Sequence, residues 1–196
     1  FSECYYLARM ENFVVSARKY RPLGFDAVVG QGHITTTLKN AIDNNHLAQA
    51  LLFCGPRGVG KTTCARILAR MVNKFEEDGN TDSSNALNIY ELDAASNNSV
   101  DDIRNLIDQV RYPPQQGTHK VYIIDEVHML SNQAFNAFLK TLEEPPPYAI
   151  FILATTEKHK VIPTILSRCQ IFDFNRIEIE DITYQLKKIE DKEGIS

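Results

Sequence analysis

The chain has 196 residues, of which 43% are hydrophobic and 23% are charged. These proportions are typical of a globular protein, and the length predicts one large domain, or one domain with a fragment of a second. The formal net charge of -4 argues against a freestanding domain that grips nucleic acid by bulk electrostatics, because neutralising phosphates requires clustered Lys and Arg.

Location and cysteine usage are also constrained by the sequence. No apolar run is long enough to cross a bilayer, and the first nine residues lack the basic start and sustained apolar core of a signal peptide. We therefore expect a cytoplasmic protein with no membrane partner. The cysteines lack paired C-x-x-C spacing, so neither a zinc ribbon nor a disulfide framework is predicted. They are Cys4, Cys54, Cys64 and Cys169, and we expect Cys54 and Cys64 to be small buried residues.

Apolar runs of strand length alternate along the chain with stretches of helical periodicity. The runs are Ala50 to Cys54, Ile89 to Leu92, Val121 to Ile124 and Ala149 to Ala154. Strands that alternate with helices predict an α/β fold with a parallel sheet covered on both faces.

A glycine-rich loop follows the first run and matches G-x-x-x-x-G-K-[ST] between a predicted strand and a predicted helix. Its glycines let successive N–H groups point at phosphate oxygens, and the helix N-terminus adds its dipole. We expect Lys61 to bridge the β and γ phosphates of ATP, and the Thr62 hydroxyl to join the shell of a Mg²⁺ ion. The predicted loop residues are Gly55, Pro56, Arg57, Gly58, Val59, Gly60, Lys61, Thr62 and Thr63.

Three segments between the strands have local signals. Residues 74–88 are polar and rich in turn formers, which predicts an exposed loop. Ser99 to Asp102 resembles a capping box, and Ser131 similarly starts a second helix that Pro145 to Pro147 end. Both helices have one apolar face, so we expect them to pack on the core.

Polar residues end the third and fourth runs. Asp125 and Glu126 after a buried strand are the expected partner of a phosphate loop. Asp125 is predicted to hold Mg²⁺, directly or through water, and Glu126 to orient and polarise the attacking water. A hydroxyl of Thr155 or Thr156 could contact the γ phosphate or that water; the alternative is a Thr pair that only ends a strand.

Several segments together resemble the clamp-loader branch of the AAA+ ATPases, and specifically its bacterial gamma/tau family. They are Ala17 to Pro22 with Phe25 to Gln31, Glu91 to Ser96, Asp125 to Leu130, Ala137 to Pro146 and Ile165 to Cys169. The match runs from about Met10 to the end. It implies an AAA+ P-loop NTPase core with a parallel five-stranded sheet flanked by helices, followed by the start of a small helical lid domain.

The resemblance also implies how the chain is divided. Residues 1–9 match nothing and are an expected N-terminal extension, residues 10–175 the nucleotide-binding domain, and residues 176–196 the beginning of the lid domain. Isolated Ile and Leu among charges after Phe174 predict a surface helix that runs to the last residue. The lid domain is expected to be truncated, with its own sensor Arg beyond Ser196.

The family implies further site residues. Thr156, in preference to Thr155, is the implied sensor of the γ phosphate. Arg168 is implied to reach the ATP of a neighbouring subunit as an arginine finger, which would raise hydrolysis by orders of magnitude; the alternative is a surface ion pair. A strap over the nucleotide base is implied at Tyr20, Arg21, Pro22, Val28 and Val29. Family members usually insert a four-cysteine zinc module after the P-loop helix, but residues 74–88 contain no cysteine, so we expect no zinc.

The resemblance implies a motor that uses ATP and Mg²⁺, assembles with other clamp-loader subunits, and places a sliding clamp on primer-template DNA. A helicase is one alternative, because Asp125 to His128 superficially resembles a DExH box; the single motor core and the Ser-Arg-Cys element disfavour it. A nucleotide-gated scaffold without turnover is another, disfavoured by Lys61 and Glu126. We find no motif for nucleotidyl transfer.

Overall fold

The computed structural model describes residues 19–73, 88–115 and 117–194. The expected N-terminal extension, Cys4 and residues 74–87, on which the expectation about zinc rests, lie outside the described residues. The predicted exposed loop 74–88 is wrong at its last residue, because Asn88 is only 2% exposed.

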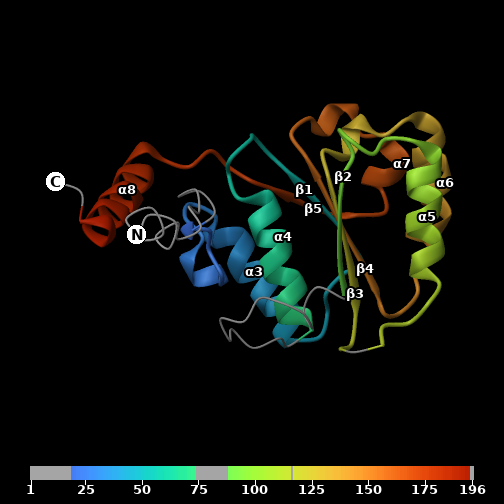
Figure 1. Cartoon of the computed structure of the whole chain (residues 1–196), viewed down its shortest axis with the longest axis horizontal. Coiled ribbons are helices and arrows are strands. Elements are labelled where there is room, and N and C mark those ends of the chain that lie inside the picture. Colours follow the sequence, from blue (N-terminus) through green and yellow to red (C-terminus); the bar gives the residue numbers. More distant parts are fainter. Residues whose placement is uncertain (1–18, 74–87, 116, 195–196) are drawn as a thin grey trace, which may run out of the picture.

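Five parallel strands form one sheet in the order β2-β3-β4-β1-β5 (Figure 1). They are β1 (Ala50–Cys54), β2 (Ile89–Asp93), β3 (Lys120–Asp125), β4 (Ala149–Thr155) and β5 (Gln170–Asp173). The four strands predicted from apolar runs are confirmed, and the fifth completes the expected sheet. No apolar run marks β5, because Phe172 is its only buried residue.

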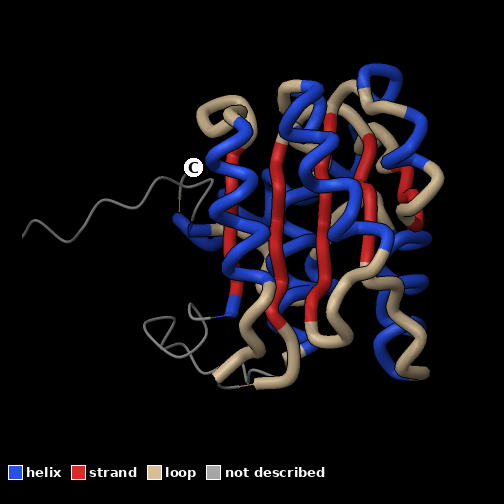
Figure 2. Tube along the Cα trace, turned by 90° about the vertical axis from the view of Figure 1, so that its right-hand side faces the viewer, coloured by secondary structure: helices blue, strands red, loops and turns tan. Residues whose placement is uncertain are grey.

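Helices cover both faces of the sheet. On one face lie α3 (Gly32–Asp43) and α4 (Lys61–Val72), together with the short helix η1 (Phe25–Ala27). On the other lie α5 (Val100–Val110), α6 (Asn132–Glu143) and α7 (Pro163–Leu166). Figure 2 looks onto the second layer, with the strands behind it. The short helices η3 (Val127–Met129) and η4 (Lys158–Lys160) follow β3 and β4.

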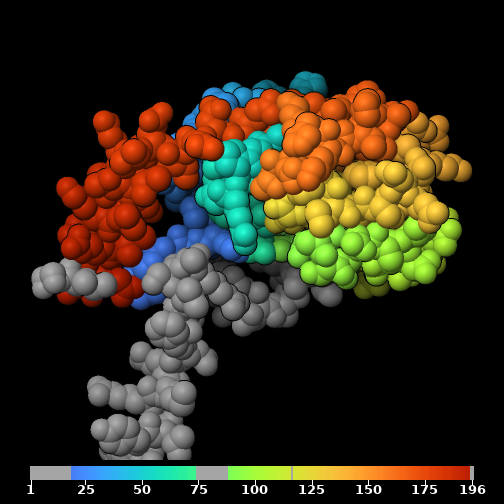
Figure 3. Space-filling view, turned by 90° about the horizontal axis from the view of Figure 1, so that it is seen from above, coloured from blue at the N-terminus to red at the C-terminus, as the bar shows by residue number. Residues whose placement is uncertain are grey.

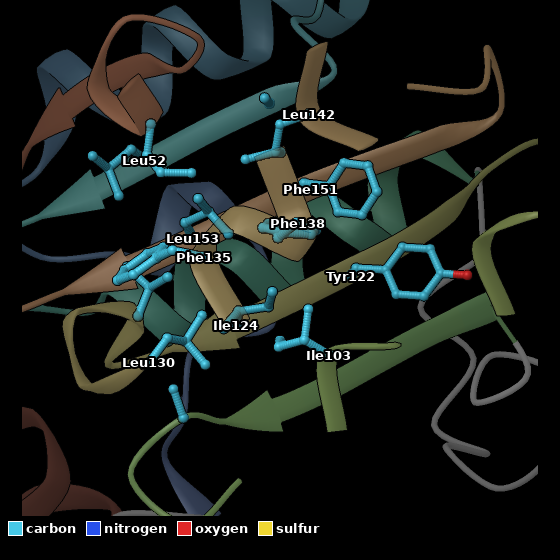
Figure 4. Close-up of a cluster of buried hydrophobic side chains, with 14 of the residues drawn as sticks. Leu52, Ile103, Tyr122, Ile124, Leu130, Phe135, Phe138, Leu142, Phe151 and Leu153 are labelled. Atoms are coloured by element: carbon cyan, nitrogen blue, oxygen red, sulfur yellow. The ribbon is translucent and has the colours of Figure 1, made fainter. Parts of the chain in front are cut away.

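Two hydrophobic cores fill the space between the sheet and its helices. Neighbouring residues of a strand point to opposite faces, so Leu52 packs in one core and Leu51 and Phe53 in the other. In the first core, Tyr122 and Phe151 stack with ring centroids 5.4 Å apart, and Phe138 of α6 meets Phe151 edge-on (Figure 4). As predicted, Cys54 and Cys64 are buried.

Both predicted helix starts are confirmed. The Ser99 side chain accepts a hydrogen bond from the backbone N–H of Asp102, whose carboxylate accepts from the Ser99 N–H, so the capping box is complete. Ser131 accepts from the N–H of Ala134 in the same way, and α6 ends at Glu143, before the prolines.

Helix α8 (Ile179–Glu193) lies at one end of the molecule, away from the sheet (Figures 1 and 3). None of its residues within Ile179–Glu193 is buried, which fits the expected surface helix. It ends earlier than predicted, because Gly194 adopts a left-handed conformation with φ of 62°. Within the described ranges, no helix is both long and apolar enough to cross a membrane.

Candidate nucleotide site

The loop between β1 and α4 needs glycine at two positions. Gly55 has a φ of 151°, and a Cβ there would lie 2.5 Å from the Phe174 carbonyl oxygen. Gly60 is left-handed, with a φ of 101°, and immediately precedes α4. A side chain at Gly55 would collide with backbone, and one at Gly60 would strain the turn that starts the helix.

Lys61 lies at the first position of α4 and is only 6% exposed. Its ammonium donates hydrogen bonds to the carbonyl oxygens of Gly55, at 2.8 Å, and Pro56, at 2.7 Å. Burial lowers the pKa of Lys61, while the carboxylates of Glu126 and Asp125 oppose that shift. A buried cation therefore faces the inside of the loop and the acids at the end of β3.

Thr62 and Asp125 meet at the centre of the site. The Thr62 hydroxyl donates to Asp125 Oδ2 at 2.6 Å, although 63 positions separate the two residues. The other carboxylate oxygen, Oδ1, accepts from the backbone N–H of Glu126 at 3.0 Å. Mg²⁺ binds hard oxygen ligands and often uses one or two protein groups beside substrate phosphates. The hydroxyl and carboxylate fit such an ion.

Glu126 lies beside Thr156 because β4 is the neighbour of β3 in the sheet. Glu126 Oε2 accepts from the Thr156 hydroxyl at 2.9 Å and from its N–H at 3.2 Å. Thr155 is fully buried, and its hydroxyl contacts His128 and accepts from the Glu157 N–H. The structure thus brings Thr156, and not Thr155, to the carboxylate proposed as the base.

Two cavities that share part of their lining adjoin the phosphate loop. The larger, of about 1110 Å³, includes Arg57, Lys61, Thr62, Asp125 and Glu126 in its wall. The second, of about 430 Å³, lies between the loop and α8 and is mostly apolar. Its wall contains Val28 and Val29 with α8 residues. Both cavities are lined by Tyr20, Pro22, Gly58, Gly60 and Thr63, and Arg21 lines the larger. Figure 3 shows the surface of the glycine-rich loop and the start of α4, in cyan, between α8, in red, and the orange and yellow surface of the later part of the chain.

Arg168 lies elsewhere. Its guanidinium pairs with the Glu143 carboxylate and donates to the Thr164 carbonyl oxygen at 2.7 Å. The described residues that line the two cavities do not include Arg168. Within one chain, Arg168 thus forms a surface ion pair, which was the sequence-based alternative to an arginine finger.

Sequence reasoning missed three features around the site. Arg66 makes a two-pronged bond to the Glu91 carboxylate, both distances being 2.6 Å, in the wall of the larger cavity. His128 contacts the carboxylate of Glu126. Gln31 is fully buried and bonds to the backbone of Asn175, on the path to α8. Arg66 follows Thr62 by one helical turn, and this spacing could have predicted that Arg66 lies on the same side of α4 as Thr62. The other two contacts depend on the tertiary fold.

Comparisons with known proteins place these features in a family. Residues 30–178 match the family model described as DNA polymerase III, delta subunit. The chain is 52% identical over 189 residues to DNA polymerase III subunit tau of Bacillus subtilis (strain 168), covering 91% of this chain and 34% of that protein. It is 45% identical over 198 residues to subunit tau of Escherichia coli (strain K12), covering 94% and 30%. The chain thus spans about a third of the length of these relatives.

Solved structures agree on the fold. A DNA polymerase III gamma subunit-related protein from Thermotoga maritima matches with a TM-score of 0.59 at 28% identity, covering 78% of this chain and 53% of that one. The RuvB Holliday junction branch migration motor of Thermotoga maritima matches with a TM-score of 0.68 at 20% identity, covering 90% and 56%, and shows the fold alone. The predicted AAA+ P-loop fold is confirmed. The chain belongs to the DNA polymerase III subunit family of this model, and tau subunits resemble it over more than nine-tenths of its length.

Proposed function

We propose that the chain is the ATP-binding and ATP-hydrolysing motor region of a bacterial clamp-loader subunit that works within the DNA polymerase III holoenzyme. The observation that carries this proposal is the 2.6 Å contact between the Thr62 hydroxyl and the Asp125 carboxylate. It joins the phosphate loop to the acidic end of β3, where Glu126 follows directly. That combination is the one phosphoryl transfer to water requires.

Each side chain has a role in the proposed reaction. Lys61 exchanges its two carbonyl partners for oxygens of the β and γ phosphates. Thr62 and Asp125 hold Mg²⁺, which when bound neutralises phosphate charge. Glu126 orients and polarises the attacking water, and Thr156 senses the γ phosphate from beside that carboxylate. Arg168 completes the site of a neighbouring subunit.

The apolar cavity is the proposed place for the base. Its volume of about 430 Å³ lies within the range of small-molecule sites, and aliphatic side chains dominate its wall. Val28 and Val29 come from the strap, and Ile182 and Leu186 from α8. Nucleotide binding would therefore bring the strap and α8 together around one ligand.

The relatives' names place the proposed function within DNA polymerase III, and the resemblance to the clamp-loader family supplies the proposed partners. Other loader subunits, a sliding clamp and primer-template DNA are the proposed partners, and the cytoplasm is the proposed location. ATP binding can drive clamp opening only if the ATP-bound assembly has the higher affinity for clamp and DNA. Hydrolysis then releases both.

The test is a Glu126→Gln exchange in the full-length subunit, reconstituted with its partner subunits. We expect ATP binding to persist and multiple-turnover phosphate release to stop, because the amide cannot act as a base. Lys61→Ala is the matched comparison and should lose binding itself.

Three results would contradict the proposal. Normal turnover by the Glu126→Gln assembly would refute the assigned base. A wild-type assembly that binds ATP without turnover would point to a nucleotide-gated scaffold. ATP-dependent strand separation without clamp loading would point to a helicase.

A further inference from the structure

His128 lies in η3, two residues after Glu126, and its side chain is only 6% exposed. Three polar side chains surround the ring. Nδ1 is 2.9 Å from the Thr155 hydroxyl and 3.3 Å from Glu126 Oε2, and Nε2 is 3.4 Å from Glu157 Oε1. The imidazole therefore bridges the proposed catalytic carboxylate to a second acid.

The described polar contacts of the Glu126 side chain all fall on one oxygen. Oε2 accepts from the hydroxyl and the N–H of Thr156, and it faces Nδ1 of His128. Thr156 directly follows β4 and His128 lies in η3, so the contacts to Oε2 come from two different elements. Oε1 is the oxygen left to meet a water. A base must lie within hydrogen-bond reach of the proton it takes, so this geometry bears directly on turnover.

The backbone of Glu126 adopts an unusual conformation that these contacts help to hold. Its φ of 48° and ψ of 44° lie in the left-handed region, which few non-glycine residues adopt. Such a conformation persists only where surrounding contacts hold it. Here the Thr156 and His128 contacts hold the side chain, while Asp125 Oδ1 accepts from the Glu126 N–H.

Glu157 fixes the other side of the imidazole. Its Oε2 lies 2.8 Å from the Lys160 ammonium, and this ion pair lowers the pKa of Glu157. Its N–H donates to the Thr155 hydroxyl at 3.0 Å. An ionised carboxylate accepts a hydrogen bond from Nε2–H and so orients the imidazole, as carboxylates do behind functional histidines generally. Nδ1 can donate to the Glu126 carboxylate at the same time only in a ring that carries a proton on both nitrogens.

We propose that His128 is a positioning residue for Glu126. In this arrangement the ring carries a proton on each nitrogen: Nδ1–H donates to Oε2, so that the carboxylate presents Oε1 to the attacking water, and Nε2–H donates to Glu157, which holds the ring in that orientation. His128 acts through Glu126 and not on the nucleotide. The inference rests on the ATPase function proposed above, and it adds a residue that the phosphate loop and the acid pair do not contain.

The test uses three exchanges that separate the two ring nitrogens. The amide of Asn reaches the place of Nδ1, the amide of Gln reaches the place of Nε2, and Leu fills the volume without a polar atom. In the full-length subunit reconstituted with its partners, we would measure the ATP Kd, kcat for phosphate release and Tm. His46→Leu, at an exposed histidine after α3, is the control for histidine loss.

We expect His128→Leu and His128→Gln to lower kcat by about ten- to a hundred-fold with unchanged Kd, the range typical of groups that orient a functional side chain. His128→Asn should retain most of the turnover, and so should His46→Leu. Full turnover by His128→Leu would overturn the inference, as would equal losses in all three exchanges that track a fall in Tm. If the wild-type assembly does not hydrolyse ATP, the proposed function fails instead.

Discussion

The Thr62 hydroxyl and the Asp125 carboxylate are the proposed protein ligands of Mg²⁺. They lie 2.6 Å apart, and both present oxygen to one point beside the phosphate loop. Exchange of Thr62 for Val removes one of the two oxygens while keeping a branched side chain. We expect Mg²⁺ to tighten ATP binding by the wild-type chain and to tighten it much less in Thr62→Val, because the ion keeps only the carboxylate.

Paired ATP titrations with Mg²⁺ and with a chelator would measure this difference. Thr37→Val is the matched control, since Thr37 is exposed on α3 and its hydroxyl donates to the His33 carbonyl oxygen. Equal Mg²⁺ dependence in Thr62→Val and the wild-type chain would show that Thr62 holds no metal.

At this scale the sequence predicts what is local and misses what the fold assembles. The glycine-rich loop is a continuous segment, so its pattern specifies both the turn and the helix start. The contact between His128 and Glu126 is close in sequence, but it requires the left-handed Glu126 backbone and the Thr155 hydroxyl from β4. No spacing of residues in the sequence predicts this contact. Likewise, whether Thr155 or Thr156 contacts Glu126 depends on which of the two is buried at the end of β4.

Among the elements, α8 depends most on its attachments, because none of its residues within Ile179–Glu193 is buried. The chain reaches α8 through Asn175, whose C=O accepts from Gln31 at 2.7 Å and whose N–H donates to Gln31 at 3.2 Å. Gly30, with a φ of 72°, lets Ile177 approach to within 3.3 Å of where a Cβ would lie. Gln31 therefore anchors the α8 side of the apolar cavity, the proposed place of the nucleotide base.

Gln31→Ala should loosen that wall. The exchange leaves the Asn175 N–H and C=O without their side-chain partner, at a cost of roughly 1–3 kcal/mol in the free energy of unfolding. We also expect weaker ATP binding, because α8 residues line the cavity that is the proposed place of the nucleotide base. Chemical denaturation and ATP titration would measure the two effects.

Gln49→Ala is the matched control for this exchange. Gln49 also donates from its amide to a backbone carbonyl, that of Pro146 at 2.7 Å, but it immediately precedes β1, at the end of the sheet opposite the phosphate loop. We expect it to lose stability and keep its ATP affinity. If Gln31→Ala also kept its ATP affinity, Gln31 would be a structural residue only.

The elements also differ in how far their sequences define them. Strands β1 to β4 and the starts of α5 and α6 are predictable, since apolar runs and capping residues act locally. Strand β5 is not, because it lies at the edge with one buried residue and takes its place from pairing with β1. The end of α8 was predictable in principle, because a glycine directly after the last helical residue, as Gly194 is here, is a common helix stop.

Across the whole molecule, the proposed site lies at the carboxyl ends of β1, β3 and β4, whereas Arg168 lies just before β5 and pairs with Glu143 of α6. An arginine that acts on a neighbouring subunit must stay on the surface and be released when the assembly forms. An exposed ion pair suits that use, since such pairs contribute little stability. In the single chain, the ion pair can thus hold Arg168 in one orientation. Breaking that pair when the assembly forms would cost little free energy.

Arg168→Ala should therefore separate binding from turnover. We expect unchanged ATP affinity in the isolated chain and, in the reconstituted assembly, a loss of turnover that approaches the roughly 10³-fold or more attributed to arginine fingers. Glu143→Gln, which removes the negative charge of the partner and keeps the arginine, is the control and should preserve turnover. Titrations on the chain and phosphate release by the assembly measure both quantities. Unaffected turnover by the Arg168→Ala assembly would leave Arg168 as the surface ion pair seen in the single chain.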